Sequence, residues 1–358
     1  MEKKLIKRKK GALFARLEFL GEFMKRKLLS LTLAILMTFL IAACDKPQEK
    51  HSESFEAMDT YMQLTVYGDK AAVQKIRDRV CELDKLLSST DPDSDIYALN
   101  KNGSATVDES TAEALIKSVQ LSRSTGGALD ITVYPIVEEW SFINKDYKIP
   151  DSAALSKLLE TVDSSAIGIK NTSVVLNKGG KVGLGAVAKG FAADEAIDIL
   201  EDSDSKGAIL NLGGTVVAYG SKNGDSWKIG IADPENSADY MGYFTCKDKV
   251  IATSGSYERY FKGEDGKTYS HIIDPKTGRP VDNGIRSVTI ICDSGFRADG
   301  LSTALFVMGR EKAEEYHRLH NNFDYVILTD DNKAYVTKGS EKSFSVAKGH
   351  DYAVKVVE

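Results

Sequence analysis

The sequence is poor in the residues that build disulfide-bonded or zinc-binding proteins. Its 358 residues include only four cysteines and five histidines, and no pair of cysteines has C-x-x-C spacing. Cys81, Cys246 and Cys292 lie far apart, so neither a disulfide scaffold nor a zinc site is expected, and we interpret them as small buried side chains. Internal repeats and compositional bias towards disorder or collagen are also missing, which leaves an ordinary globular chain.

Positive charge is scarce beyond the N-terminus. Residues 1–43 carry ten Lys and Arg against three Glu, whereas the rest of the chain has a net charge of about −12. Proteins that bind nucleic acid need a basic face that neutralises phosphates. The acidic body therefore argues against nucleic acid as a partner.

Long apolar runs are equally rare, and the clearest one lies near the N-terminus. Leu28 to Ala43 is an uncharged run of 16 residues that follows Lys25, Arg26 and Lys27. A basic segment, an apolar run and small residues are typical of a secretory signal, and the run is slightly short for a membrane span. We predict that residues 1–43 are a signal peptide; an uncleaved anchor is the alternative, and both place the body outside the cytosol.

The end of this run carries a second signal. Ile41-Ala42-Ala43-Cys44 resembles a bacterial lipobox, which implies cleavage before Cys44, diacylglycerol on its sulfur and attachment to the outer face of the cytoplasmic membrane. We expect residues 44–56 to be the lipidated cysteine and a polar tether, and residues 57–358 to be the folded domain. Met24 is the more usual start for such a signal; an unusually long basic segment is the other explanation.

Apolar periodicity predicts short strands mixed with helices. Alternation indicates a strand at 61–67, and further strands are expected at 173–176, 208–212, 216–219, 227–231, 250–253, 269–273, 287–291 and 325–328. Helices are expected at 73–87, 110–126, 153–159, 188–200, 298–308 and 311–319, the second opening with a capping box at Ser110 and Glu113. The irregular order predicts an α+β fold in one domain, with two lobes at most.

Three segments could carry chemistry. Asp299 and Thr303 are four residues apart on a predicted helix, so they share a face and offer two hard oxygen donors suited to Mg²⁺; Asp299 could instead merely complement the helix N-terminus. Gly183 and Gly185 lead into a helix that carries Lys189, a turn that can bind phosphate, although it matches neither the G-x-G-x-x-G motif nor a P-loop. His271 lies near the end of a predicted strand and could act as a general base, or be structural.

Other polar residues are weaker candidates. His317 and His320 are three residues apart on a predicted helix that is rich in charge. A solvated helix face is a simpler interpretation of these two histidines than a metal-binding pair. Ser254 follows a strand but lacks the G-x-S-x-G frame of a nucleophile elbow.

In order along the chain, these segments are similar to one family. The matching stretches are AMDTYMQLTVYG, LDKLLSSTDPDSDIYALN, GGALDITVYPIVEEWSF, GLGAVAKGFAADEA, LNLGGTVVAYG, WKIGIADP, IATSGSYERYF, SHIIDPKTGRP and ADGLSTALFVMG. Together with the lipobox they resemble the FAD:protein FMN transferases, the ApbE or thiamine-biosynthesis lipoprotein family. The resemblance covers about residues 55 to 330.

The resemblance implies a compact domain, T-fold-like, with FAD held between two lobes. It implies Mg²⁺-dependent transfer of FMN from FAD to a Thr or Ser of an acceptor protein, with release of AMP. Its metal positions match Ala186, Asp299, Ser302 and Thr303, with Ala186 and Ser302 expected to contribute backbone carbonyls. Its FAD contacts match Met58, Ala128, Leu129, Asp130, Gly183, Lys189 and Ile272, and its catalytic base matches His271.

The chain departs from the family pattern at two positions. Many relatives carry Asp at the position of Gly183, and Asp or Asn at the position of Thr215. Contacts to FAD are therefore expected to differ. The acceptor is expected to belong to a membrane or extracellular redox system. Two other functions stay open from the sequence: hydrolysis of FAD to FMN and AMP by the same site, and a surface lipoprotein that binds flavin without turnover.

Overall fold

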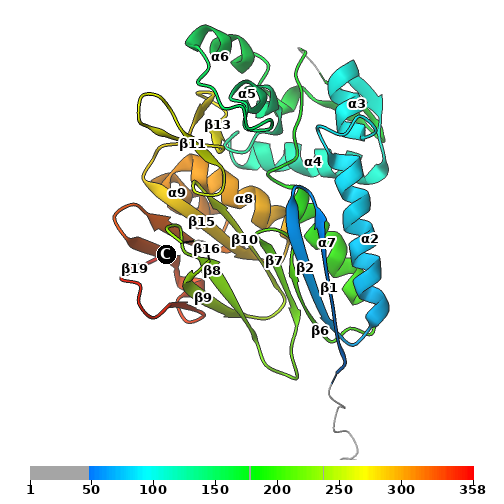
Figure 1. Ribbon diagram of the computed structural model, residues 1–358, viewed down its shortest axis with the longest axis vertical. Helices are drawn as coiled ribbons and strands as arrows, with labels where there is room; N and C mark the ends of the chain where they lie inside the picture. Colours follow the sequence, from blue (N-terminus) through cyan, green and yellow to red (C-terminus); the bar gives the residue numbers. More distant parts are fainter. Residues whose placement is uncertain (1–47, 177–178, 237) are drawn as a thin grey trace, which may run out of the picture. The chain divides into compact units, whose positions relative to one another are not determined.

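A nine-stranded sheet forms the centre of the molecule. The computed structural model describes residues 48–176, 179–236 and 238–358, and residues 49–358 form one compact unit. The predicted signal peptide and Cys44 lie outside the described residues. From edge to edge (Figure 1) the sheet contains β1 (Lys50–Ala57), β2 (Thr60–Tyr67), β6 (Gly207–Asn211), β7 (Thr215–Gly220), β10 (Lys249–Gly255), β15 (Ile285–Cys292), β16 (Asp324–Thr329), β17 (Lys333–Thr337) and β19 (Ala353–Val357).

Neighbouring strands of this sheet are antiparallel except for the last pair, β17 and β19. Alternation within the strands gives the sheet two apolar faces. In β10, for example, Val250 and Ala252 belong to the core on one face, whereas Ile251 belongs to the core on the other. The sheet is therefore the middle layer of three.

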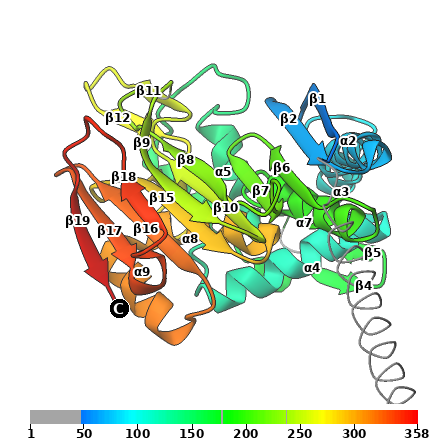
Figure 2. The ribbon, with the colours of Figure 1, turned by 90° about the horizontal axis from the view of Figure 1, so that it is seen from below.

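Helices cover one face of the sheet (Figure 2). The chief ones are α2 (Lys70–Leu87), α4 (Glu109–Ser124), α7 (Ala188–Glu201) and α8 (Gly295–Met308). In α2 the predicted apolar positions are buried: Val73, Ile76, Val80, Leu83 and Leu87. Each such side chain stabilises the fold by about 1.5–3 kcal/mol relative to full exposure.

A small sheet covers the opposite face. It has the order β18 (Phe344–Val346), β9 (Tyr240–Cys246) and β8 (Trp227–Ala232), and it packs Trp227, Ile229 and Phe244 against Ile251 and Ile291 of the large sheet. Residues far apart in the sequence thus complete this layer.

A third apolar cluster supports two hairpins near one end of the sheet. Ile136, Trp140 and Phe142 pack with Leu155 and Ile273, and the indole N–H of Trp140 donates to the carbonyl of Gly278 at 2.8 Å. The elements involved are η1 (Ile131–Val133), α5 (Tyr134–Glu139), α6 (Ser152–Leu159), hairpin β11 (Tyr260–Lys262) with β12 (Thr268–Ser270), and hairpin β13 (Ile273–Asp274) with β14 (Arg279–Pro280).

The remaining elements lie at the periphery. They are α3 (Asp95–Asn102), α9 (Arg310–Leu319), the three-stranded sheet β3 (Ser104–Thr106), β5 (Ser173–Val175) and β4 (Gly168–Lys170), and the short turns η2 (Ser164–Ala166) and η3 (Lys338–Ser340). Within the part of the chain that the structure describes, no helix is both long and apolar enough to cross a bilayer.

The α+β fold class in a single compact domain is confirmed; the division into two lobes stays a prediction. Three local predictions need correction. Residues 50–56, expected in the tether, belong to β1, which pairs along its whole length with β2. The N-cap of α4 is Asp108 rather than Ser110, whose hydroxyl instead accepts from Arg79. The strand expected at 269–273 is divided by His271 and Ile272.

Candidate functional site

Helices α7 and α8 cross in direct backbone contact, and this crossing determines where the side chains of the site lie. A Cβ on Gly190 would lie 2.2 Å from the carbonyl oxygen of Gly295, and a Cβ on Gly295 would lie 2.4 Å from that of Gly190. Only glycine permits so close an approach. The contact brings Asp299 of α8 to the first turn of α7, where its Oδ2 accepts the N–H of Gly190 at 2.8 Å.

A second carboxylate makes the reverse contact. Asp194 of α7 accepts from the N–H groups of Gly295 and Phe296 and from the hydroxyl of Ser294 at 3.0 Å. The two N–H groups belong to the first turn of α8, where backbone donors have no partner within the helix. Each helix thus supplies one carboxylate to the beginning of the other, which fixes their relative position.

Asp299 is buried, yet its carboxylate is only partly bonded. The residue is 6% exposed, and among the described residues its carboxylate has one hydrogen-bond partner besides Gly190, the hydroxyl of Thr215, which lies 3.4 Å from Oδ1. Burial raises the pKa of Asp299, and Lys189 opposes that effect. An anionic carboxylate here would be stabilised by a cation near Oδ1.

A backbone carbonyl near the beginning of α7 has no backbone partner. Ala186 precedes Val187, the N-cap of α7, and no backbone N–H of the described residues donates to the carbonyl oxygen of Ala186. Gly190, four residues later, donates its N–H to Asp299. The predicted metal position at Ala186 therefore has an available oxygen one turn before the residue that Asp299 bonds.

Two hydroxyls complete this end of the site. Thr303 is half-buried one turn after Asp299, and its Oγ1 lies 3.1 Å from the Oγ of Ser254 on β10. The hydroxyl of Ser302 is fully buried and donates to the carbonyl of Asp299 at 2.7 Å. Among the described residues no group of three or more His, Cys, Asp or Glu could hold a metal. A cation at Asp299 would need hydroxyl, carbonyl and ligand oxygens, the donors that Mg²⁺ prefers.

His271 is held in the tautomer that leaves Nε2 able to accept a proton. Its Nδ1 lies 3.2 Å from the carbonyl oxygen of Arg259, which can only accept, so the hydrogen is on Nδ1 and Nε2 keeps a free lone pair. Burial, with a smaller contribution from the positive charges of Arg259 and Lys189, lowers the pKa of His271 to about 4, although the hydrogen bond to the carbonyl of Arg259 acts in the opposite direction. The imidazole is therefore neutral near pH 7.

The sequence did not single out Glu258, which lies in the same charged group. Although its side chain is exposed to solvent, surrounding protein removes water from the carboxylate and raises its pKa to about 7, with Lys189 opposing and Asp299 adding to that effect. The only sequence signal was its place in the SYERY segment. Glu258 thus interacts through its charge with Asp299, Lys189 and Arg259.

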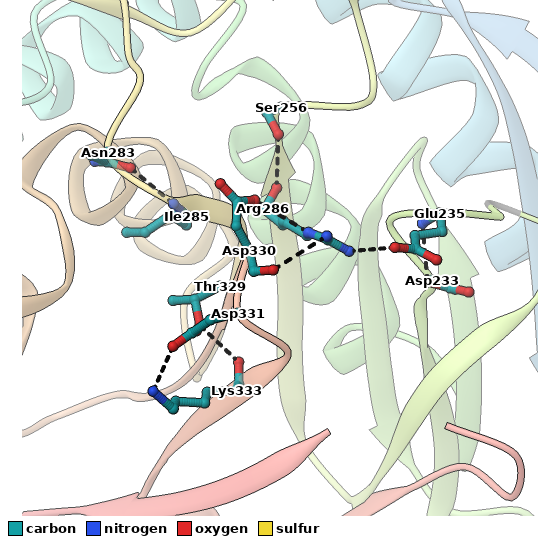
Figure 3. Close-up of polar contacts among 10 residues, drawn as sticks. All are labelled: Asp233, Glu235, Ser256, Asn283, Ile285, Arg286, Thr329, Asp330, Asp331 and Lys333. Carbon is teal, nitrogen blue, oxygen red and sulfur yellow. Dashed lines mark hydrogen bonds and ion pairs between the residues drawn. The ribbon is translucent and has the colours of Figure 1, made fainter. Parts of the chain in front are cut away.

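Arg286 holds the segment that carries Glu258 and Arg259 (Figure 3). Its carbonyl accepts both the N–H and the hydroxyl of Ser256, at 3.0 and 3.3 Å. Its guanidinium bonds Glu235 at 2.8 Å and Asp330 at 3.2 Å. The turn after β10 is thereby tied to two other loops.

Met58 lies at a hairpin tip near the glycine turn that precedes β7. Met58 and Asp59 have φ of 51° and 57°, as the two-residue turn between β1 and β2 requires. A Cβ on Gly213 would lie 2.2 Å from the side chain of Thr60, so this tip packs on the turn leading to Thr215. The structure thus places Met58 on the side of the site where Asp299 is bonded.

The other predicted flavin positions are mostly buried. Ala128 and Leu129 are 7% and 3% exposed, and Leu129 faces Gly300 of α8. Asp130 accepts from Thr132 and from the N–H of Ser164 at 3.1 Å, so its carboxylate is engaged inside the protein. Ile272 is 4% exposed beside His271.

Gly183 has no room for a side chain in this protein. A Cβ there would lie 2.4 Å from the ring of Tyr134. Tyr134 therefore fills the space that an aspartate at this position would take, which gives a physical reason for the departure noted in the sequence.

The weak candidate pair near α9 is divided: His320 is exposed, as expected of a solvated face, but His317 is buried. His317 is 8% exposed, and its Nε2 lies 2.9 Å from the carbonyl of Phe323, so we interpret it as structural. A surface pocket of about 300 Å³, lined by Pro135, Glu138, Leu158 and Lys181 among others, also contains none of the predicted site residues.

Comparison with known proteins identifies the family. The model of the ApbE family matches residues 58–327. An FAD:protein FMN transferase of Haemophilus influenzae is 30% identical over 336 residues, which span 88% of this chain and 96% of the relative; one from Vibrio cholerae is 32% identical over 296 residues, 78% and 87% of the two chains.

Solved structures agree as well. The crystal structure of the ApbE protein of Thermotoga maritima has a TM-score of 0.76 at 29% identity and covers 82% of this chain and 99% of its own. The flavin transferase ApbE from Vibrio cholerae has a TM-score of 0.73 at 26% identity, covering 83% and 100%. Because the family model matches well over half of the residues, this chain belongs to the ApbE family.

Proposed function

We propose that this protein is an FAD:protein FMN transferase that uses Mg²⁺ to move FMN from FAD onto a Ser or Thr hydroxyl of an acceptor protein, with release of AMP. The names of the relatives support flavin transfer. The observation that carries the rest is the partly bonded carboxylate of Asp299. It accepts from Gly190, one turn after the available carbonyl of Ala186, and it lies one turn before Thr303 on α8.

These donors fit a magnesium ion. Mg²⁺ takes oxygen ligands and is usually held by one or two carboxylates together with substrate phosphates. When bound, it would neutralise charge on the pyrophosphate of FAD. Asp299 supplies the anionic ligand, and the N–H of Gly190 holds that carboxylate in place.

The protein's own groups would bind the rest of FAD. The charge of Lys189 and the positive end of the α7 dipole together favour phosphate at the beginning of this helix. Met58 is proposed to contact the flavin from the hairpin tip, and Ala128, Leu129, Asp130, Gly183 and Ile272 to line or support its site.

His271 is proposed as the general base. Its Nε2 lone pair accepts the proton of the acceptor hydroxyl while the hydroxyl oxygen forms a bond to the FMN phosphorus. The bond from that phosphorus to the bridging oxygen breaks, and AMP leaves with the electron pair. A neutral imidazole held by the carbonyl of Arg259 is already in the required state near pH 7.

We propose that the enzyme acts outside the cytosol, anchored to the bacterial membrane through lipidated Cys44. The basic and apolar N-terminal segment supports that location. The acceptor is then a protein of a membrane or extracellular redox system.

Mass spectrometry of a candidate acceptor, after incubation with the protein, FAD and Mg²⁺, tests the proposal. The expected result is an acceptor heavier by FMN less water on one Ser or Thr, with one AMP released per label. FMN and AMP without a labelled acceptor would indicate hydrolysis instead. FAD retained without AMP would contradict any turnover.

A further inference from the structure

A chain of three hydroxyls leads from the proposed metal site into the protein. The Oγ of Ser254 on β10 lies 3.1 Å from Oγ1 of Thr303 and 2.7 Å from Oγ of Ser302. The hydroxyl of Ser302 in turn donates to the carbonyl of Asp299 at 2.7 Å. Ser254 therefore contacts both hydroxyls of α8 that follow the proposed metal-binding carboxylate.

The carbonyl at the end fixes the direction of every hydrogen in the chain. A carbonyl oxygen only accepts, so the hydrogen of Ser302 is committed to Asp299. Ser302 can then only accept from Ser254, which uses the single hydrogen of Ser254. The contact between Ser254 and Thr303 is a hydrogen bond only if Thr303 donates. With all three bonds formed, the hydrogen of Thr303 points to Ser254 and its lone pairs are left for another partner.

We infer that Ser254 is a positioning residue for the proposed Mg²⁺ site, acting through Thr303. A hydroxyl can ligate a cation only through its lone pairs, so its hydrogen must point elsewhere. Ser254 accepts that hydrogen and holds the rotamer of Thr303 before any cation arrives. Partners that orient metal ligands in this way typically change metal affinity by about 10- to 100-fold when they are removed. The inference rests on the proposed function, because it assumes a cation at Asp299 and Thr303.

Strand β10 also carries a comparable hydroxyl that pairs with another hydroxyl but is not linked to the proposed metal site. Thr253 lies next to Ser254, and its Oγ1 is 2.9 Å from that of Thr289 on β15. Its neighbours in β10 alternate between the two faces of the sheet, so Thr253 points away from the side on which Ser254 meets α8. A hydroxyl loss at Thr253 thus tests whether any damage to β10 is enough to disturb the site.

The experiment measures binding of Mn²⁺ to the full, FAD-saturated protein by electron paramagnetic resonance, with Mg²⁺ as competitor. The variants are Ser254→Ala, Ser254→Thr, Thr303→Val, the double variant Ser254→Ala with Thr303→Val, and Thr253→Val as the control. Ser254→Ala is expected to weaken cation binding about 10- to 100-fold, Ser254→Thr to restore part of the loss, and Thr253→Val to leave it unchanged.

The double variant distinguishes positioning from general damage. If Ser254 acts through Thr303, adding Ser254→Ala to Thr303→Val causes no further loss. Unchanged affinity in Ser254→Ala, or a full additional loss in the double variant, overturns the inference while leaving the proposed function intact. Absence of cation binding by the unmodified protein with FAD overturns the proposed function as well.

Ser302→Ala provides a second approach if Ser254→Ala does not fold. Removing the hydroxyl of Ser302 releases the hydrogen of Ser254, which can then turn to Thr303 and force the hydrogen of Thr303 towards the cation. Weaker Mn²⁺ binding is expected, and unchanged binding contradicts the direction assigned to the chain of hydroxyls.

Discussion

Asp194 and Asp299 occupy matching places at the crossing of α7 and α8, but their surroundings differ. Asp194 accepts from two backbone N–H groups and the hydroxyl of Ser294. Asp299 accepts one N–H at 2.8 Å and has a second donor only at 3.4 Å, although it is almost completely buried. A carboxylate whose lone pairs are occupied holds a fold together, whereas one that is buried with free lone pairs is prepared for a ligand.

The substitution with the largest expected effect on activity is Asp299→Asn, which tests whether this carboxylate binds a ligand rather than holds the fold together. Asp299→Asn keeps the shape of the side chain and an oxygen for Gly190 but loses the charge. We expect AMP release with Mg²⁺ to fall about 10³-fold, since electrostatic stabilisation by a bound cation contributes several kcal/mol. The free energy of unfolding should stay within about 1 kcal/mol, because a buried charge is also costly. Asp198→Asn, on the exposed side of α7, is the control for loss of one charge; full activity in Asp299→Asn would remove it from the mechanism.

Asp194→Ala should have the reverse effect: it should lower the stability of the protein and leave Mg²⁺ binding nearly unchanged. Losing a carboxylate that accepts from the first turn of α8 is expected to lower the free energy of unfolding by about 2–4 kcal/mol, from the lost cap and charged hydrogen bonds. Chemical denaturation measures the change. Below the unfolding transition, the apparent affinity for Mg²⁺ should remain within a few-fold of the unmodified protein. A large loss of Mg²⁺ affinity with normal stability would contradict the separation.

Gly190→Ala disturbs both carboxylates at once. The added Cβ would meet the carbonyl of Gly295 at 2.2 Å and the Cβ of Asp299 at 2.6 Å, so the helices must move apart. We expect a loss of about 1–3 kcal/mol in the free energy of unfolding, together with weaker Mg²⁺ binding. Ala substitution at Gly185, where a Cβ meets nothing within 4 Å, is the control.

The pH dependence reports on His271. Because burial lowers its pKa to about 4, the acid limb of kcat/KM should lie well below the ordinary histidine value of about 6.5. Between these two values the unfolded chain binds the proton that the folded protein does not, so His271 makes stability fall as the pH decreases from 6.5 towards 4. An acid limb near 6.5 that disappears in His271→Gln would show that the imidazole is not desolvated.

Local spacing predicted part of this site. The four-residue spacing of Asp299 and Thr303 was sufficient to place them on one face of a predicted helix. The apolar patterns located α7, α8 and most of the central strands. By contrast, β1 was missed because only Phe55 and Ala57 in KHSESFEA are apolar, as expected of an edge strand with mostly exposed positions. Its pairing with β2 supplies what its own side chains do not indicate.

The rest depends on contacts that no local pattern contains. The contact that brings Asp299 to the first turn of α7 is its bond from the N–H of Gly190, which lies 109 residues earlier in the sequence. The raised pKa of Glu258 results from desolvation by surrounding protein and from the negative charge of Asp299, against the opposing charge of Lys189; both of these residues come from other parts of the chain. The role of Ser254 likewise requires β10 to lie against α8.

Crystals grown with FAD and Mn²⁺ test the central claim most directly, because anomalous scattering identifies the ion. We predict a single strong peak within about 2.0–2.3 Å of a carboxylate oxygen of Asp299 and of Oγ1 of Thr303, on the pyrophosphate side of FAD. A peak elsewhere, or FAD bound with its pyrophosphate directed away from Asp299, would contradict the account.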